Sequence, residues 1–402
     1  MPNWDLPRVL NSHCALRTLL GIGPMSRNCV DAAIQLANEL RTLIILIASR
    51  RQVDSARFGG GYVNNWTTPQ FAEYVRARDR GGFVLLARDH GGPWQHDVEM
   101  TLGLDREAAM ELAMESFEVD IDAGFDILHL DPNHNPTGAT PADLREFTER
   151  TKELLYSCRQ AAARRNRHVS IEIGTDEGAI GPAEPWQIED MVEDVLAFCR
   201  SEALDRPDFL VVQTGTKVME MQNVGSLDEQ IRTFGEIAPD AALHVLMALC
   251  RRHGLLMKEH NADYLSDTTL KWHPRWGVHS ANVAPEFGVA ETCAFLGILR
   301  QLDLHRLEDQ FLTLAFESRK WEKWMLPDSV ASDRDRAVIA GHYVFSTPRF
   351  FELRCDAERA AARSSIDLDA QLRSVVKDRI ARYLASFRAS QLPYANSTVE
   401  LT

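Results

Sequence analysis

The sequence predicts an α/β protein, a closed (β/α)₈ TIM barrel followed by a helical C-terminal extension. Eight short apolar runs, rich in β-branched residues, alternate along the chain with longer amphipathic segments. Continuous apolar runs of this kind are typical of parallel strands buried on both faces, and their alternation with helices indicates βα units. Eight such units make a closed barrel the simplest architecture, with an open doubly wound sheet as the alternative.

The strands can be placed individually. In chain order they are expected at Leu19–Gly23, Thr42–Ala48, Gly82–Ala87, Asp126–Leu130, His168–Ile173, Phe209–Val212, Leu255–Met257 and Trp276–Val278. Helices are expected between them at Arg106–Val119, Ala142–Arg165, Pro185–Phe198 and Asp240–His253. Proline suits the first turn of a helix, and Gly254 suits the position that follows the last turn.

The strand pattern stops near Leu302. Two later segments, Leu304–Trp324 and Leu368–Phe387, have helical periodicity and are separated by a loop-rich stretch. We therefore expect two parts, a barrel over residues 1–301 and a helical extension over residues 302–402. The extension is expected to pack on the barrel, where it would cover the barrel or form an oligomer contact.

The composition limits the possible partners. The 402 residues are 45% hydrophobic and 25% charged, as in an ordinary globular protein, and the formal net charge is −14. This charge argues against nucleic acid, which is bound through clustered Lys and Arg. No apolar stretch approaches the ~18 residues of a membrane span, and the first residues do not resemble a signal peptide. Seven scattered cysteines, none in a close pair, predict reduced thiols in a cytoplasmic protein.

Polar clusters follow most of the predicted strands. Any one cluster means little because loops are polar, but catalytic groups of barrel enzymes lie where strands end, so their recurrence predicts a catalytic face. The clusters are Ser49-Arg50-Arg51-Gln52, Arg88-Asp89-His90, Asp131-Pro132-Asn133-His134, Gly174-Thr175-Asp176-Glu177, Gln213-Thr214, Lys258-Glu259-His260-Asn261-Ala262-Asp263 and His279-Ser280-Ala281-Asn282.

Two of these clusters predict a metal site. His90 and His260 stand at two strand ends, with Asp131, Glu172 and Asp176 on intervening strands. Imidazole and carboxylate together form the usual ligand set for Zn²⁺, Mn²⁺ or Fe²⁺. A single strand-end histidine is more often a hydrogen-bonded structural residue, but two histidines with several carboxylates favour a metal. His129 and His168, inside or at the start of strands, are interpreted as structural, whereas His134 and His279 stay open as substrate contacts.

A series of motifs runs in a specific order along most of the chain. They are Gln52-Val53, Phe58-Gly59-Gly60, Thr68-Pro69, Asp89-His90-x-Gly92-Pro93-Trp94-Gln95, Ala123-Gly124-Phe125, His129-Leu130-Asp131, Ile173-Gly174-Thr175, Val211-Val212-Gln213, His260-x-x-Asp263-Tyr264 and Ser332-Asp333-Arg334. In this order and spacing the sequence resembles the class II tagatose-bisphosphate aldolase accessory-subunit family. Its relatives include metal-dependent ketose and ketose-phosphate 4-epimerases.

The resemblance implies a class II aldolase-type barrel and a reaction. A divalent metal, Zn²⁺ first and Mn²⁺ or Fe²⁺ as alternatives, would chelate a ketose and stabilise the enediolate formed when C3–C4 breaks. The implied metal ligands are His90, His260 and Asp176, with Glu172 as a further candidate. The implied acid–base residues are Asp89, Asp131 and Asp263. The candidate substrate contacts are Arg50, Gln52, Gln213, His279 and Asn282.

The sequence also departs from the family pattern. Ile47 stands where the family has an acid at the end of strand two, and the strand-eight region reads Val283-Ala284-Pro285-Glu286-Phe287. A charged Glu286 near a phosphate site would repel the ligand, which argues against a phosphorylated substrate. Arg50 and Arg51 could instead clamp a carboxylate or phosphate elsewhere.

Two functions from different classes remain. The first is an enzyme, a metal-dependent aldolase or C4-epimerase that acts on a ketose, a ketose phosphate or a related sugar. The second is a non-catalytic subunit that stabilises a separate aldolase chain. A homo-oligomer is expected in the first case and a hetero-oligomer with an aldolase subunit in the second. The sequence leaves open which sugar, which metal, and cleavage or epimerisation, because both reactions break C3–C4.

Overall fold

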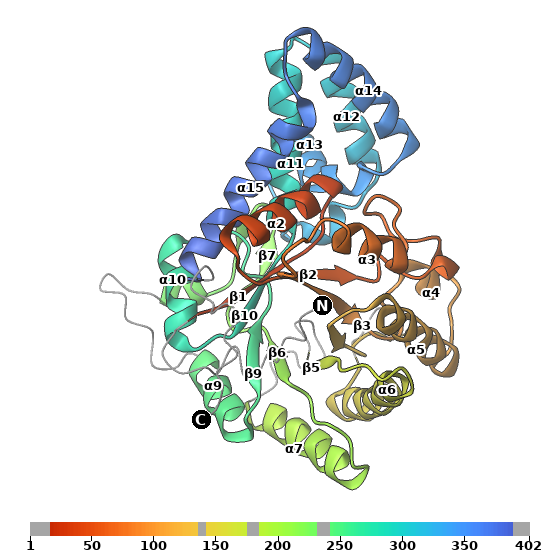
Figure 1. The fold of residues 1–402 in the computed structure, drawn as a ribbon. Coiled ribbons are helices and arrows are strands. Elements are labelled where there is room, and N and C mark those ends of the chain that lie inside the picture. Colours follow the sequence, from red (N-terminus) through yellow and green to blue (C-terminus); the bar gives the residue numbers. More distant parts are fainter. Residues whose placement is uncertain (1–16, 136–141, 175–184, 231–241, 389–402) are drawn as a thin grey trace, which may run out of the picture.

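Eight parallel strands close into a barrel, as predicted (Figure 1). The computed structural model describes residues 17–135, 142–174, 185–230 and 242–388. Around the barrel the strands follow the order β1-β10-β9-β6-β5-β4-β3-β2. Their bounds are β1 Leu19–Ile22, β2 Ile44–Ser49, β3 Val84–Gly91, β4 Ile127–Leu130, β5 Ser170–Gly174, β6 Phe209–Val212, β9 Leu256–Glu259 and β10 Ser280–Val283. A small hairpin, β7 Val218–Met219 and β8 Gln222–Asn223, follows β6.

Helices surround the barrel, and their ends follow local sequence signals. For example, the Asp105 carboxylate accepts a hydrogen bond from the Ala108 N–H at the start of α5, which ends at Gly124 in the left-handed region (φ 85°). The helices are α2 Arg27–Leu40, α3 Thr68–Arg76, α4 Asp97–Thr101, α5 Arg106–Ala123, α6 Leu144–Arg164, α7 Pro185–Ser201, α8 Leu227–Gln230, α9 Ala242–His253, α10 Asp267–Trp276 and α11 Pro285–Gln301. Among the helices that the structure describes, none is long and apolar enough to span a membrane.

The predicted position of strand eight was wrong. Trp276 ends helix α10, which continues through Pro274 and stops at Gly277 with φ 86°. The strand begins only at Ser280 and pairs with β1 through residues 280–283. The apolar run at Trp276–Val278 is buried because a helix end packs there, and burial alone does not distinguish a helix end from a short strand.

Side chains fill the barrel interior in layers, because alternate residues of each strand point inward. The lower layers are apolar, built from Leu19, Leu43, Ile45, Ile47, Leu85, Ala87, Ile127, Phe209 and Leu256. Two residues further along their strands, His129 follows Ile127 and Lys258 follows Leu256. A polar layer therefore lies above the apolar ones, and the residues at the carboxyl ends of the strands lie above that.

The extension has an apolar core of its own. It contains α12 His305–Glu317, α13 Asp333–Ala340, α14 Pro348–Arg363 and α15 Leu368–Ser386, with 3₁₀ turns η2 Glu322–Trp324 and η3 Gly341–Val344. Figure 1 shows α12 and α14 standing away from the barrel, joined to it by α11 and α15. Its core begins within α11, at Val289, and the end of α15 belongs to the barrel core through Ile380 and Tyr383. The division at residue 301 stays a prediction, since apolar contacts cross it.

Candidate metal centre

A β-bulge in β3 brings Asp89 and His90 to the same side of the strand. Arg88 pairs with Leu128 and Gly91 with Leu130, so β3 carries one extra residue at this point. His90 has φ 45°, in the left-handed region that non-glycine residues rarely adopt. Neighbouring residues of a regular strand point to opposite faces, whereas a bulge redirects one of them. The local backbone is therefore strained at the position that aims both side chains at one point.

Three side chains meet there. Nε2 of His90 lies 3.8 Å from Oδ2 of Asp89, and Nε2 of His260 lies 3.5 Å from Oδ1. His260 follows β9 directly, on the other side of the barrel from β3. One donor atom from each residue lies within 4.8 Å of the other two, so Asp89, His90 and His260 form a cluster that could hold a metal ion.

The orientation of His90 is fixed by a second carboxylate. Nδ1 of His90 donates to Oδ2 of Asp131 over 2.8 Å. Gln95 donates to the same oxygen and to the Asp131 carbonyl, over 3.2 and 3.1 Å. A carboxylate on one ring nitrogen is the usual arrangement around metal-bound histidine, because it fixes the tautomer and leaves the other nitrogen as the ligand. Asp131 thus turns Nε2 of His90 toward Asp89 and His260.

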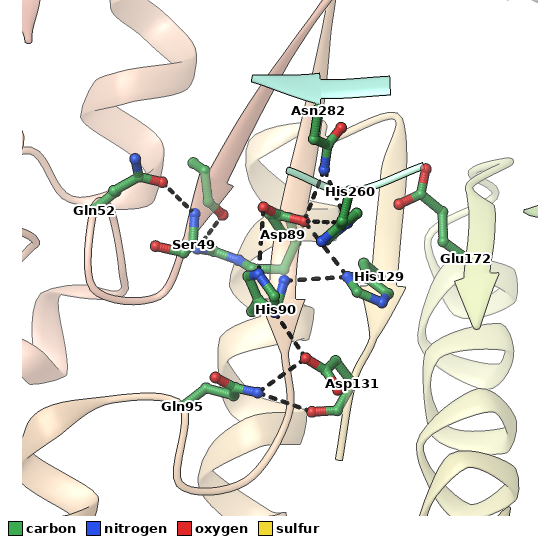
Figure 2. A network of polar contacts seen from close by, with 12 residues as sticks. Ser49, Gln52, Asp89, His90, Gln95, His129, Asp131, Glu172, His260 and Asn282 are labelled. Carbon is green, nitrogen blue, oxygen red and sulfur yellow. Dashed lines mark hydrogen bonds and ion pairs between the residues drawn. The ribbon is translucent and has the colours of Figure 1, made fainter. Parts of the chain in front are cut away.

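Two more polar side chains complete the network in Figure 2. Nδ2 of Asn282 lies 3.0 Å from Nε2 of His260 and 3.4 Å from Oδ1 of Asp89. Nε2 of His129 lies 2.9 Å from the Gly174 carbonyl, and its Nδ1 lies 3.3 Å from the His90 backbone N–H and 3.5 Å from Asp89. His129 therefore holds the bulge in place from within the barrel.

The donor set fits a divalent metal. Ligand atoms about 2.1 Å from a tetrahedral zinc lie roughly 3.4 Å from one another. The separations of 3.8 and 3.5 Å, one to each oxygen of Asp89, are close to this value. Two imidazoles and a carboxylate suit Zn²⁺, Mn²⁺ or Fe²⁺. In addition, Oδ1 of Asp131 and Oδ1 of Asn282 are buried without a hydrogen-bond partner among the described residues. Such atoms are rare inside proteins and are often explained by an ion or ligand.

Mutual electrostatics favour charge in this cluster. Burial opposes ionisation of Asp89, yet His90, His260, His129 and Lys258 hold the pKa of Asp89 well below its usual range. Burial likewise opposes protonation of His129, but Asp89, Asp131 and Glu172 raise its pKa. The carboxylate of Asp89 is therefore anionic at neutral pH, the form in which carboxylates bind metals.

Several predicted site residues have structural partners instead. Arg50 is fully buried between Asp54 and Glu99, at 2.9 and 2.7 Å, so it is not available as a substrate clamp. Glu172 forms a fully buried ion pair with Nζ of Lys258, at 2.8 and 3.0 Å, and lies outside the metal cluster.

Three further candidates also lie elsewhere. The Asp263 carboxylate accepts from the N–H groups of Ala284 and Glu286 at the start of α11, and burial raises its pKa to about 8. His279 precedes β10, at the amino end of the strand, where Nδ1 accepts from the Met257 N–H. Gln213 donates to the Thr216 carbonyl of its own loop.

The remaining expectations divide as follows. Asp89, His90, Asp131, His260 and Asn282 come together, and Gln52 accepts a hydrogen bond from the Ser49 N–H beside them over 2.9 Å. Asp176 lies outside the described residues. The sequence reasoning did not place His129 or Gln95 at the site. Period-two alternation could have found His129, since it shares a face of β4 with Ile127 and Asp131.

Glu286, expected to repel a phosphate, has partners of its own within the fold. Its carboxylate accepts from the Tyr264 N–H over 2.7 Å and from the Tyr383 hydroxyl, and Arg382 lies 3.6 Å away. The Glu286 carboxylate therefore links the start of α11 to α15.

Comparison with known proteins gives one related sequence. The D-tagatose-1,6-bisphosphate aldolase subunit GatZ of Escherichia coli (strain UMN026) is 28% identical over 211 residues. The match covers 47% of this chain and 48% of that protein, so the chain matches about half the length of this curated relative. No family model matches the chain. The match supports the resemblance that the motifs indicated.

Solved structures share the fold. A probable tagatose 6-phosphate kinase from Sinorhizobium meliloti has a TM-score of 0.68 at 18% identity, covering 92% of this chain and all of that one. A fructose-bisphosphate aldolase from Campylobacter jejuni gives 0.52 at 10% identity, covering 96% and 93%. The YdjI aldolase from Escherichia coli K12 gives 0.50 at 14%, covering 96% of each chain. At these identities the likeness shows the barrel with its extension and nothing finer.

Proposed function

Since the chain is a relative of the tagatose-bisphosphate aldolase subunit family, we propose that it is a divalent-metal-dependent retro-aldol enzyme. Its substrate would be a ketose, a ketose phosphate or a related sugar, and its reaction either aldol cleavage or C4 epimerisation. The observation that carries the proposal is the orientation of His90 by Asp131, which directs Nε2 of His90 at Asp89 and His260. A cytoplasmic location stays a prediction.

Each residue of the centre has a distinct proposed role. His90 and His260 would hold the metal, Zn²⁺ first. Asp89 would be the third donor or, when substrate displaces it, the base that receives the proton of the substrate hydroxyl. Asn282 would orient that hydroxyl, since its amide already lies beside Asp89 and His260. When bound, the cation would supply stabilisation of the negative charge that develops on the substrate oxygens.

The deciding experiment combines metal analysis with a product screen. We expect close to one zinc per chain after purification, and turnover of at least one ketose or ketose phosphate. His90→Ala should lose both the metal and the activity. His305→Ala changes an exposed histidine of the extension and serves as the matched control. Protein without stoichiometric metal, together with unchanged activity of His90→Ala, would contradict the proposal.

A second function is supported by the name of the related sequence, which is described as an aldolase subunit. In that case the chain would stabilise a separate catalytic barrel. The expectation is then no turnover by the purified chain, and activity only after a second barrel protein is co-expressed. Size-exclusion chromatography of the two proteins, alone and mixed, separates this case from the first.

A further inference from the structure

One segment of the extension, residues 318–346, contacts the loops or helices that follow four barrel strands. Nζ of Lys320 pairs with Asp97, in the segment after β3, over 3.0 Å. The Glu220 N–H, in the hairpin after β6, donates to the Trp324 carbonyl over 2.7 Å. The Asn64 N–H, after β2, donates to the Ser346 hydroxyl over 2.7 Å. The segment therefore lies against the carboxyl end of the barrel, where the metal centre is.

The same segment also reaches helix α11, which follows β10. His342 packs so closely on Gly288 that a Cβ there would lie 2.6 Å from the imidazole. In the barrel order, β3 and β6 are separated by β4 and β5. Residues 320–324 therefore connect the segments that follow β3 and β6 at the carboxyl end of the barrel. We call residues 320–324 the crossing segment.

A continuous wall runs from the metal centre to the crossing segment. Ser49 lies beside Asp89 in the strand register, and the Ser49 N–H donates to Gln52. The Tyr62 N–H donates to the carbonyl of Arg51, the neighbour of Gln52, over 3.0 Å, and the Tyr62 ring lies 4.8 Å from that of Tyr343. The Tyr343 hydroxyl in turn accepts from the Trp324 indole over 3.2 Å. Buried or half-buried side chains thus line one path outward from the site.

Positive charge gathers at the outer end of this wall. Nζ of Lys323 lies 4.6 Å from the centre of the Trp324 ring and 5.9 Å from that of Tyr343. No carboxylate lies within ion-pair distance of Lys323 among the residues that the structure describes. Nearby, Arg51 and Lys320 share the single carboxylate of Asp97, at 2.7 and 3.0 Å. This excess of cations stands out in a chain whose net charge is −14.

We propose that the crossing segment and Tyr343 form the outer wall of the active site, with Lys323 binding an anionic group at the far end of the sugar. This inference rests on the proposed function, because it takes the reacting end of the sugar to lie at the metal centre. The bound group is a phosphate or a carboxylate, and an ammonium group accommodates either as a point charge. The aromatic rings hold Lys323 in place by cation–π attraction and face the C–H groups of the sugar chain.

The test compares three sugars that differ only in the group at C6. D-Tagatose 6-phosphate, D-tagaturonate and D-tagatose carry a phosphate, a carboxylate and a hydroxyl. We would titrate each into zinc-loaded full-length protein by calorimetry. The wild type is expected to bind one of the two anionic sugars more tightly than D-tagatose, and the preferred sugar identifies the anion.

Substitution of Lys323 then tests whether this residue causes the tighter binding of the anionic sugar. Lys323→Met should weaken binding of the preferred anionic sugar about tenfold, the usual effect of losing one charge-assisted contact, and leave D-tagatose binding unchanged. Lys323→Arg should restore most of the affinity. Lys271→Met removes an exposed lysine of α10 and is the matched control, expected to bind like the wild type.

The outcomes separate this inference from the proposed function. Equal binding of all three sugars by the wild type, or an equal loss for all three in Lys323→Met, would overturn the inference even if the protein turns over a sugar. Discrimination that depends on Lys323 in a protein without turnover would support the inference and count against the enzyme. No binding of any of the three sugars overturns it as well.

Discussion

At the scale of single residues, Asp131 decides what His90 can bind. The buried carboxylate holds Nδ1 of His90 and is itself held by Gln95. An imidazole without this partner would rotate and could present either nitrogen. Loss of a carboxylate that holds a metal-binding histidine in this way typically lowers metal affinity by about 10–100-fold.

Asp131→Asn is therefore expected to lower zinc affinity by about 10–100-fold while the fold persists. The amide is nearly the same size but carries no charge for the imidazole to donate to. Affinity is measured by competition with a chromophoric chelator, and the fold by circular dichroism. Asp309→Asn, on an exposed position of α12, is the control. Equal affinity of both variants would show that Asp131 has no influence on the metal.

Arg50 was expected to contact the substrate, but in the structure it stabilises the fold through buried ion pairs. It joins Asp54 and Glu99 where none of the three meets solvent. Arg50→Met would leave two buried carboxylates without their cation and should cost about 3–5 kcal/mol of unfolding free energy. Arg51→Met, at a side chain that is 36% exposed, should cost less than about 1 kcal/mol. Urea denaturation measures both, and similar costs would contradict the structural role.

At the scale of elements, the pairing of β1 with β10 determines where Asn282 lies in the site. Gly21 faces Asn282 in the register. A Cβ at Gly21 would lie 2.2 Å from Oδ1 of Asn282, so only glycine leaves room for the amide beside Asp89 and His260. Because Gly21 has no side chain, the Asn282 amide can lie beside Asp89 and His260.

Gly21→Ala is expected to displace Asn282 and reduce kcat/KM of the proposed reaction, by about 100-fold if the shift reaches 1 Å. Gly297→Ala, in the middle of α11 with open space around it, is the control and should stabilise the protein by about 0.5–1 kcal/mol. The comparison uses steady-state kinetics together with thermal unfolding. Unchanged kinetics of Gly21→Ala would mean that Asn282 tolerates displacement.

The sequence predicted the elements better than their ends. Seven of the eight strands lie where the apolar runs placed them, because a parallel strand buried on both faces reads as one continuous run. The prediction of strand eight failed because the strand, Ser280–Val283, includes a polar Ser and Asn that face the barrel interior. The end of helix α10 was more apolar than the strand that follows it.

Part of the site was predictable and part was not. Asp89, Asp131, His90 and His260 follow from residue type and place on a strand. The partners of Arg50, Glu172 and Asp263 do not, because strand-end position says nothing of which oppositely charged group or helix start lies within reach. The contacts of the crossing segment were also beyond prediction, since they join residues more than 100 positions apart.

At the scale of the whole molecule, buried histidines make stability depend on pH. Burial lowers the pKa of His273 to about 4 and that of His342 to about 3. Both are uncharged in the folded protein and take up a proton near pH 6.5 once unfolded. The unfolded state therefore binds more protons between about pH 6.5 and 4, and the folded state loses stability as the pH falls through this range.

Each of the two histidines should contribute a slope of about 1.4 kcal/mol per pH unit below pH 6. His342→Gln is expected to reduce the total slope, because glutamine does not titrate. The measurement is the free energy of unfolding in urea at pH 7, 6 and 5. His305→Gln, at a side chain that is 70% exposed, should leave the slope unchanged. Parallel curves for all three proteins would contradict the assignment of His342.

The pairing of β1 with β10 also bears on how the chain is made. The barrel closes through contacts between residues 19–22 and 280–283, and α15 then packs on α2. During synthesis on a ribosome, one edge of β1 stays unpaired until β10 has been synthesised, when most of the chain has emerged. Contacts this distant in sequence slow folding and expose strand edges to wrong partners. We therefore expect folding during synthesis to benefit from chaperones, and a chain that ends before α15 to leave helix α2 uncovered.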